Sequence, residues 1–318
     1  MVRGKSKLKE PVTPINKLTR LSLGWNIVFM IILLIGVLLV LVPIALIVIV
    51  SFTPASSIAA RGYNFIPESF TLQAYFYLFK TGSQLLTSYW VSIYTTLGGT
   101  ALSLIVTTMF AYVISLRTFR FRKALTNILV FTMLFSGGLV PLYILNVNYL
   151  HINDTPWIYI LSNMSVPLVN VLYTIVLRTF IRTTIPESVM ESARIDGAGH
   201  FRIFIRIVLP LLKPGLATIA LFNIVNRWND FYTALLFVSK PNLMPLQTLL
   251  YQLQSKIDFL RNNSSLAGTP DGAQLLRTMP DQNLRMACTL IVILPMIAAY
   301  PYFQRYFVNG LTLGSVKE

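Results

Sequence analysis

A charge-free apolar run at residues 25–51 limits the possible folds of this chain more than any other feature. A bilayer core about 30 Å thick is crossed by about 20 helical residues. Because lipid offers no hydrogen-bond partners, such a run is stable there only as a helix, and it is too long for a barrel strand. Five further apolar runs follow, at residues 89–116, 124–145, 157–177, 209–238 and 286–303. The sequence therefore predicts an all-α integral membrane protein with six transmembrane helices.

The composition supports this prediction and narrows the chemistry. Charged residues make up 12% of the chain, about half of the roughly 25% found in soluble domains. One cysteine, Cys288, and two histidines cannot form an internal disulfide or a thiol-based metal site. No P-loop sequence and no Ser-His-Asp set stands out. We expect no catalytic residues, no metal and no cofactor bound by this chain, which should not be an enzyme.

The 26 Lys and Arg residues are concentrated in particular connections between the predicted helices. They gather before residue 25, at residues 117–123 and at residues 178–213. Lys and Arg accumulate on the cytoplasmic side of membrane proteins, so this distribution predicts that both termini are cytoplasmic. The net charge of +15 is then a topology signal, and we do not expect nucleic-acid binding.

These assignments divide the chain into five parts. Residues 1–24 form a basic cytoplasmic tail, residues 25–51 the first span, and residues 52–88 an outward-facing segment. Residues 89–307 form a core of five transmembrane helices, and residues 308–318 a cytoplasmic tail. Within the core, residues 182–208 form a cytoplasmic loop and residues 240–283 an outward-facing one.

The cytoplasmic loop at residues 182–208 carries the most specific local signals. Pro186 suits the first turn of a helix, where its missing N–H costs nothing, and Glu187 favours the positive end of the helix dipole. Gly197 can end this helix in a left-handed conformation. A second apolar stripe follows, formed by Phe201, Phe204, Ile205 and Val208. Two short helices around a glycine turn indicate either a docking surface or an amphipathic segment on the membrane.

A motif in this loop favours docking. The residues Glu191-Ser192-Ala193, then Gly197 after three residues, then Ile207-Val208-Leu209-Pro210 after nine more, stand in fixed spacing. This pattern resembles the EAA loop of carbohydrate-type ABC importer permeases, with Ser192 in place of the first alanine. The segment 226–231 is similar to the Trp-Asn segment of carbohydrate-type permeases, and the segments 136–141 and 244–250 resemble the oligosaccharide and aldouronate branch of that family.

The resemblance implies a MetI-like helical fold in a bacterial cell membrane. It further implies a second permease subunit, two ATPase subunits that bind ATP and Mg, and an external solute-binding protein. The cargo would be an oligosaccharide. The loop would couple this chain to the ATPase through Glu187, Glu191, Ser192, Ala193, Asp196, Gly197 and Pro210.

The fifth apolar run contains charges that are costly in lipid and mark either a pathway or an ion pair. Arg227 and Asp230 are three residues apart and can meet on one helical face. In the pathway hypothesis, an arginine would suit a sugar carboxylate, which guanidinium binds in bidentate fashion. Arg227→Ala would then reduce uptake of an acidic sugar more than that of a neutral one. The candidate pathway residues are Asn223, Asn226, Arg227, Trp228, Asn229 and Asp230.

Two other classes of function remain as alternatives. An ion-driven secondary transporter predicts an inverted repeat with paired broken helices, and we find no such repeat. A membrane-embedded enzyme predicts several acids or metal ligands within the spans, where Asp230 is the one carboxylate. Neither alternative needs a cytoplasmic docking loop, so that loop favours the importer.

Overall fold

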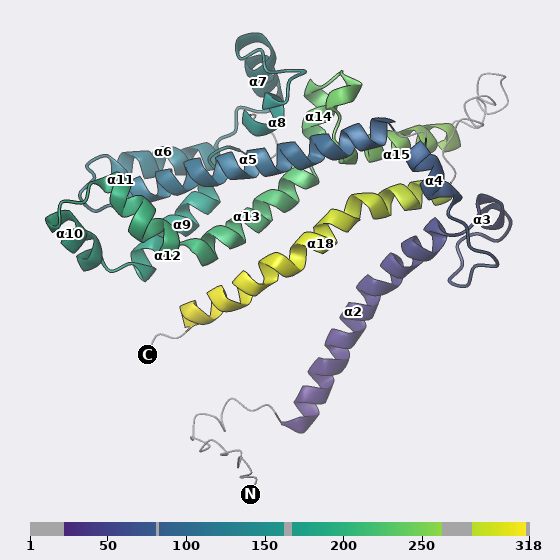
Figure 1. Ribbon diagram of the computed structural model, residues 1–318, viewed down its shortest axis with the longest axis horizontal. Coiled ribbons are helices and arrows are strands. Elements are labelled where there is room, and N and C mark those ends of the chain that lie inside the picture. The colour runs from purple at the N-terminus through teal and green to yellow at the C-terminus, as the bar shows by residue number, and fades with distance from the viewer. Residues whose placement is uncertain (1–21, 81–82, 162–166, 263–281, 316–318) are drawn as a thin grey trace, which may run out of the picture.

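The computed structural model describes residues 22–80, 83–161, 167–262 and 282–315 (Figure 1). This part of the chain is helical and contains no strands. Residues 1–21 of the predicted tail at residues 1–24, and residues 263–281 of the loop at residues 240–283, lie outside the described residues.

The long helix α5 (Ser83–Ser115) organises the packing of the core (Figure 1). It packs along α9 (Val171–Thr184) and α13 (Lys213–Trp228). Many of its buried residues are small, among them Ser92, Thr96, Gly99 and Ser103. Small residues let helix backbones approach closely where lipid supplies no hydrophobic driving force.

Two long helices lie beside this core. The N-terminal α2 (Leu23–Ser51) packs mainly on α18 (Gln282–Ser315), and in Figure 1 its first turns diverge from the other helices. None of its most apolar stretch is buried within the chain. A helix that is apolar on every side suits contact with lipid or another membrane helix. Helix α18 ends at Ser315, so most of the predicted tail at residues 308–318 is helical.

The number of spans differs from the prediction of six. Three helices, in α2, α5 and α18, are long and apolar enough to cross a membrane. Two bent pairs raise that number to five if each pair is one span. One pair joins α6 (Arg122–Leu134) to α7 (Leu139–Ile144) and η1 (Leu145–Tyr149), with a bend of 111°. The break falls at Gly138, whose φ of 84° ends regular helix.

The predicted span at residues 157–177 is not one continuous helix. It contains the short α8 (Trp157–Leu161) and the start of α9 at Val171. Asn170 caps α9, because its side chain accepts a hydrogen bond from the Tyr173 backbone N–H at 3.1 Å. A capping residue satisfies an N–H that has no partner inside the helix, and so fixes a new helix start.

The predicted span at residues 209–238 is also interrupted. Helix α13 ends at Trp228, and α14 (Tyr232–Phe237) begins after a short break. Asp230 precedes Phe231, the N-cap residue of α14, and accepts hydrogen bonds from the backbone N–H and the hydroxyl of Thr233, at 3.1 and 2.6 Å. A carboxylate at this position favours a new helix over continuation of the old one.

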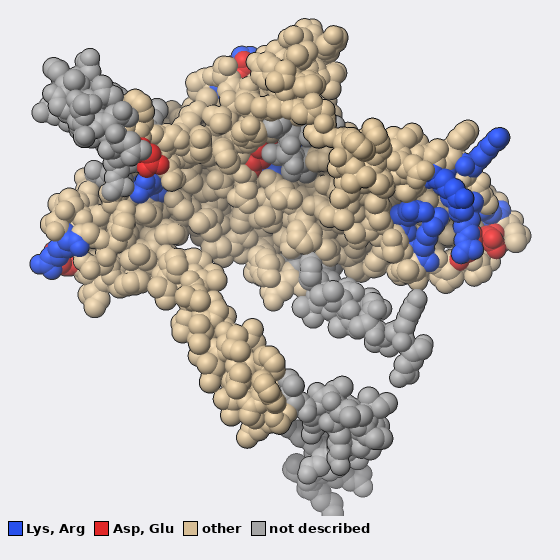
Figure 2. Space-filling view, turned by 180° about the vertical axis from the view of Figure 1, so that it is seen from behind, with Lys and Arg blue, Asp and Glu red and all other residues tan. Residues whose placement is uncertain are grey.

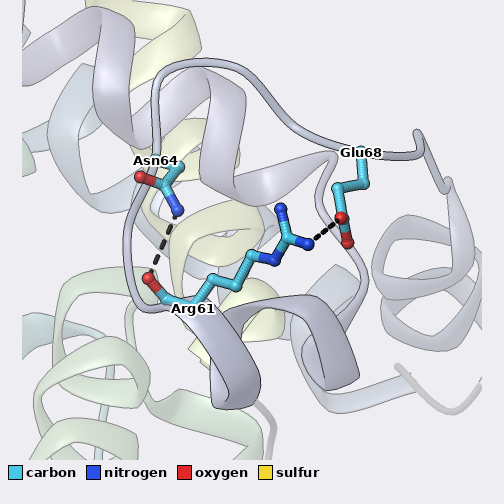
Figure 3. Close-up of polar contacts among 3 residues, drawn as sticks. All are labelled: Arg61, Asn64 and Glu68. Carbon is cyan, nitrogen blue, oxygen red and sulfur yellow. Dashed lines mark hydrogen bonds and ion pairs between the residues drawn. The ribbon is translucent and has the colours of Figure 1, made fainter.

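The segments predicted to face outward contain more helix than the sequence suggests. Residues 52–88 contain α3 (Ala55–Arg61), α4 (Gln73–Lys80) and the first turn of α5. After α3 the chain is held by an Arg61–Glu68 ion pair at 2.7 Å, while the Asn64 amide donates to the Arg61 carbonyl (Figure 3). Residues 240–262 form a short 3-10 turn, η3 (Pro241–Leu243), and α15 (Leu246–Asn262).

Candidate coupling and pathway sites

The helix α10 (Glu187–Ile195) begins and ends as its sequence predicts. Pro186 occupies the N-cap, and Glu187 in the first turn pairs with Arg117 at 3.1 Å. At the other end Gly197 has φ 78°. Its N–H donates to the Arg194 carbonyl at 3.0 Å, and the Ala198 N–H donates to the Ala193 carbonyl at 2.9 Å. These bonds form a Schellman motif, and the predicted left-handed turn is confirmed.

Buried side chains attach the segment that contains α10 to the membrane helices. Met190 of α10 and Ile203 of α11 (His200–Ile203) lie in one core cluster with Leu177 of α9. The ring of Phe204 lies 5.3 Å from that of Tyr112 on α5. Met190, Ile203 and Phe204 therefore pack this segment against α5 and α9.

The same segment also presents apolar side chains to the outside. Ile195 is 86% exposed and Phe201 is 68% exposed, while Val189 and Ile205 are also exposed. The second apolar stripe predicted from the sequence is therefore divided between two environments. Phe201 and Ile205 are exposed, whereas Phe204 is buried in the core cluster. Exposed apolar side chains grouped in this way indicate a surface that another molecule covers.

Further residues of the motif have distinct places. Glu191, Ser192 and Asp196 are exposed on α10 or at its end, and Ala193 packs partly against the buried cluster. Pro210 lies in α12 (Leu209–Leu211), which follows the π-helical turn η2 (Phe204–Val208). The helix through residues 200–211 meets α13 at an angle of 78°. Pro210 supplies no N–H to the helical ladder, which favours this bend.

Arg227, the first candidate pathway residue, is buried between helices in this conformation. Its side chain is 8% exposed, and its Nη1 donates to the Tyr159 carbonyl at 2.6 Å. Gly99 of α5 lies directly against the guanidinium, since a Cβ there would stand 2.5 Å from Nη1. Sequence reasoning missed Gly99, whose one visible signal was a glycine pair within an apolar run.

Two more of the candidates are also core residues here. The indole N–H of Trp228 donates to the Val292 carbonyl of α18 at 3.0 Å, and Tyr89 packs edge-on against the indole. Asn223 is 1% exposed. Its amide donates to the Ile219 carbonyl of its own helix at 3.4 Å.

The remaining candidates lie closer to the surface of the chain. Asn226 and Asn229 are exposed, and Asp230 is half-buried at the α14 cap. The Asn229 Oδ1 accepts a hydrogen bond from the Gln247 amide of α15 at 2.9 Å. The structure therefore divides the six candidates into a buried set and an accessible set, and adds Gln247 to the latter.

Charged side chains are distributed unevenly over the surface. On the face shown in Figure 2, Lys and Arg gather at the end of the molecule that contains α10, while most of the remaining surface is uncharged. Among the described residues, no three His, Cys, Asp or Glu side chains are grouped so that they could hold a metal ion.

The family described as "Binding-protein-dependent transport system inner membrane component" matches residues 108–312. The chain belongs to this family. The match covers α6, α10 and α13 together, so the candidate coupling and pathway residues lie within the family's shared region. The family membership supports the predicted MetI-like helical fold and places the chain in a membrane.

Several known proteins are similar to this chain over most of its length. The chain is 38% identical to Protein LplC of Bacillus subtilis, over 87% of this chain and 89% of that protein. It is 35% identical to the polygalacturonan/rhamnogalacturonan transport system permease protein YtcP of the same organism, over 90% of this chain and 95% of that one. YtcP and other relatives of this chain are named as transport permeases rather than enzymes.

A solved structure has the same architecture. The chain superimposes with a TM-score of 0.76 on a chain of a bacterial ABC transporter involved in the import of the acidic polysaccharide alginate. The identity is 28%, and the match covers 93% of this chain and 98% of that one. The two chains therefore share one fold over most of their lengths.

Proposed function

We propose that this chain is a permease subunit of an ABC importer that carries an acidic, uronate-containing oligosaccharide into the cytoplasm. The observation that carries the proposal is its likeness, over nearly the full length, to a permease named for polygalacturonan and rhamnogalacturonan and to an alginate importer. Those polysaccharides are polyanions. The family description supports an external binding protein as a partner, and an ABC importer obtains its energy from separate ATPase subunits.

The proposed topology has six crossings with both termini in the cytoplasm of a bacterium. The long helices α2, α5 and α18 cross singly. The bent α6–η1 pair and α13 with its preceding turns cross as interrupted spans. Helices α8 and α9 together complete the sixth crossing. The concentration of Lys and Arg around α10 supports a cytoplasmic position for that end of the molecule.

The proposed coupling element is α10 with its Gly197 turn. Ile195 at the end of α10 and Phe201 of the following α11 are exposed and suit a cleft on an ATPase subunit, and Glu191 is exposed on α10. Met190 and Phe204 transmit the movement of that subunit to α9 and α5. ATP and Mg would be bound by the ATPase, and the membrane core would contain a second, related permease.

The proposed pathway surface is the accessible set around the end of α13. Asn226, Asn229 and Gln247 offer amide groups, which hydrogen-bond well to sugar hydroxyls. Arg227 lies behind this surface in the present conformation. Its contact with a sugar carboxylate would require α13 and α5 to separate during transport.

The partners can be tested by affinity purification of the full chain in mild detergent, followed by mass spectrometry. We expect an ATPase and a second permease to copurify. The exposed apolar surface of α10 is the reason, because it is stable in water only when covered. Recovery of this chain alone after crosslinking would contradict the importer and favour an ion-driven secondary transporter.

The substrate can be tested by uptake in the native host, comparing the intact strain with one that lacks this chain. We expect the deletion to abolish uptake of labelled oligogalacturonate and to leave uptake of a neutral arabino-oligosaccharide unchanged. Restoring the chain from a plasmid is the control. Equal loss of both sugars would contradict acidic specificity while leaving the importer intact.

A further inference from the structure

Basic side chains from two separate parts of the chain meet at the end of the molecule that contains α10 (Figure 2). Arg117 and Arg122 belong to the connection between α5 and the start of α6, whereas Arg178 and Arg182 lie in the last turns of α9. The charges of Arg117, Arg122 and Arg178 all act on Arg182. These four residues are called the basic cluster below.

The negative charge of Glu187 acts on the basic cluster but does not balance its positive charge. It pairs with Arg117 at 3.1 Å and also acts on Arg182. Arg182 is held in place, because its Nε donates to the Ser115 carbonyl at the end of α5 at 3.2 Å. The positive charges of Arg117, Arg122 and Arg178 repel that of Arg182, and an additional bound anion would relieve that repulsion.

A cavity beside the basic cluster offers room for such an anion. Its volume is about 110 Å³, and it lies between the end of α5, the end of α9 and α10. Arg117, Arg182 and Arg194 line it together with Glu187 and Glu191. The Nε atoms of Arg178 and Arg194 are buried and have no hydrogen-bond partner within the described chain. Guanidinium groups bind phosphate oxygens through paired N–H donors.

The surroundings of the basic cluster favour a lipid as the source of the phosphate. Helix α6 starts at Arg122 and has no buried residue among those described. Its exposed side chains, such as Ile128 and Phe131, are apolar, as expected of a helix that contacts lipid tails. In the proposed topology its basic start lies at the level of the cytoplasmic headgroups.

We propose that the basic cluster and its cavity bind the phosphate of an anionic phospholipid headgroup. Basic pockets between helices on the cytoplasmic side are suited to anionic headgroups. The inference rests on the proposed topology but not on the identity of the sugar. A lipid bound there would join α5, α6 and α9 at the base of the coupling element.

The test measures retention of phosphatidylglycerol by the purified full chain, using native mass spectrometry and thermal stability. The test variant is Arg122→Gln with Arg182→Gln. The control is Arg202→Gln with Arg206→Gln, which removes equal charge from exposed positions on α11 and η2, outside the basic cluster. We expect the test variant to lose about tenfold in apparent affinity for phosphatidylglycerol, and the control to retain it.

Stability in phosphatidylcholine alone shows whether the test variant still folds. Should it not fold, the single variants Arg122→Gln and Arg182→Gln replace it, each with a smaller expected loss. Equal loss in test and control variants would overturn the proposal in favour of diffuse surface charge. Stabilisation of the wild type by inorganic phosphate, as strong as by phosphatidylglycerol, would overturn the lipid as the source. Unchanged lipid retention with loss of the copurifying ATPase would assign the cluster to subunit docking instead.

Discussion

Gly99→Ala is expected to lower the free energy of unfolding by about 2 kcal/mol and to reduce uptake of every substrate alike. The new methyl group would stand 2.5 Å from Nη1 and 2.8 Å from Cζ of Arg227. The guanidinium cannot simply move aside, because it is buried and bonded to the Tyr159 carbonyl at 2.6 Å. Displacing it would leave both the buried charge and that carbonyl poorly satisfied. The apparent melting temperature in mild detergent, measured beside uptake, checks this.

The adjacent Gly98 provides a matched control. A Cβ at Gly98 would meet a single atom within 4 Å, the Cδ1 of Ile160 at 3.8 Å, which is an ordinary contact. Gly98→Ala should therefore preserve stability and uptake. If Gly99→Ala lowered uptake of the acidic sugar alone and left stability intact, the guanidinium would act on substrate rather than hold α5 against α13. The double variant Gly99→Ala with Arg227→Met should regain part of the lost stability, because the clash is then removed.

Gly197→Val is expected to reduce the amount of ATPase that copurifies with this chain by roughly tenfold, while membrane insertion remains normal. Gly197 has φ 78°, a conformation that a β-branched residue adopts only under strain. The strain would open the turn that ends α10 and shift Ile195 relative to Phe201, which together form the exposed apolar surface. Quantitative pull-down in mild detergent, with the second permease as internal standard, measures the change.

Gly199 provides the control for this variant. It stands two residues later in the same loop, its φ is −68°, and no atom lies within 4 Å of a Cβ built on it. Gly199→Val should therefore leave recovery of the ATPase near the wild-type level. Equal loss in both variants would show that the loop tolerates no added bulk, and would remove the left-handed turn as the cause. Normal recovery with Gly197→Val would contradict the coupling role of the turn.

The main features of the docking segment could be predicted because local interactions determine them. Pro186 and Glu187 mark a helix start and Gly197 marks its end, and each acts through backbone groups within a few residues. The length of the apolar runs likewise predicted the long helices α2, α5 and α18, since hydropathy alone indicates a segment that can cross lipid.

The interruptions within the other apolar runs were harder to predict. Asn170 and Asp230 stand inside predicted spans, where their short polar side chains looked like features of continuous helices. Each instead accepts a hydrogen bond from a backbone N–H in the first turn of a new helix. Hydropathy averages over such residues, whereas a cap depends on the local direction of one side chain.

By itself, the sequence determined that this chain is a helical membrane protein and that the short helix α10 has a defined start and end. Apolar length and local backbone chemistry are sufficient for both. Only the tertiary structure decided which polar residues of α13 are accessible. Arg227 and Asn226 are adjacent in sequence, but a helix turns by about 100° per residue. One therefore lies against Gly99 and the other reaches the surface. The packing of α5 and α8 against α13 determines which of the two is buried, and that contact joins residues far apart in the chain.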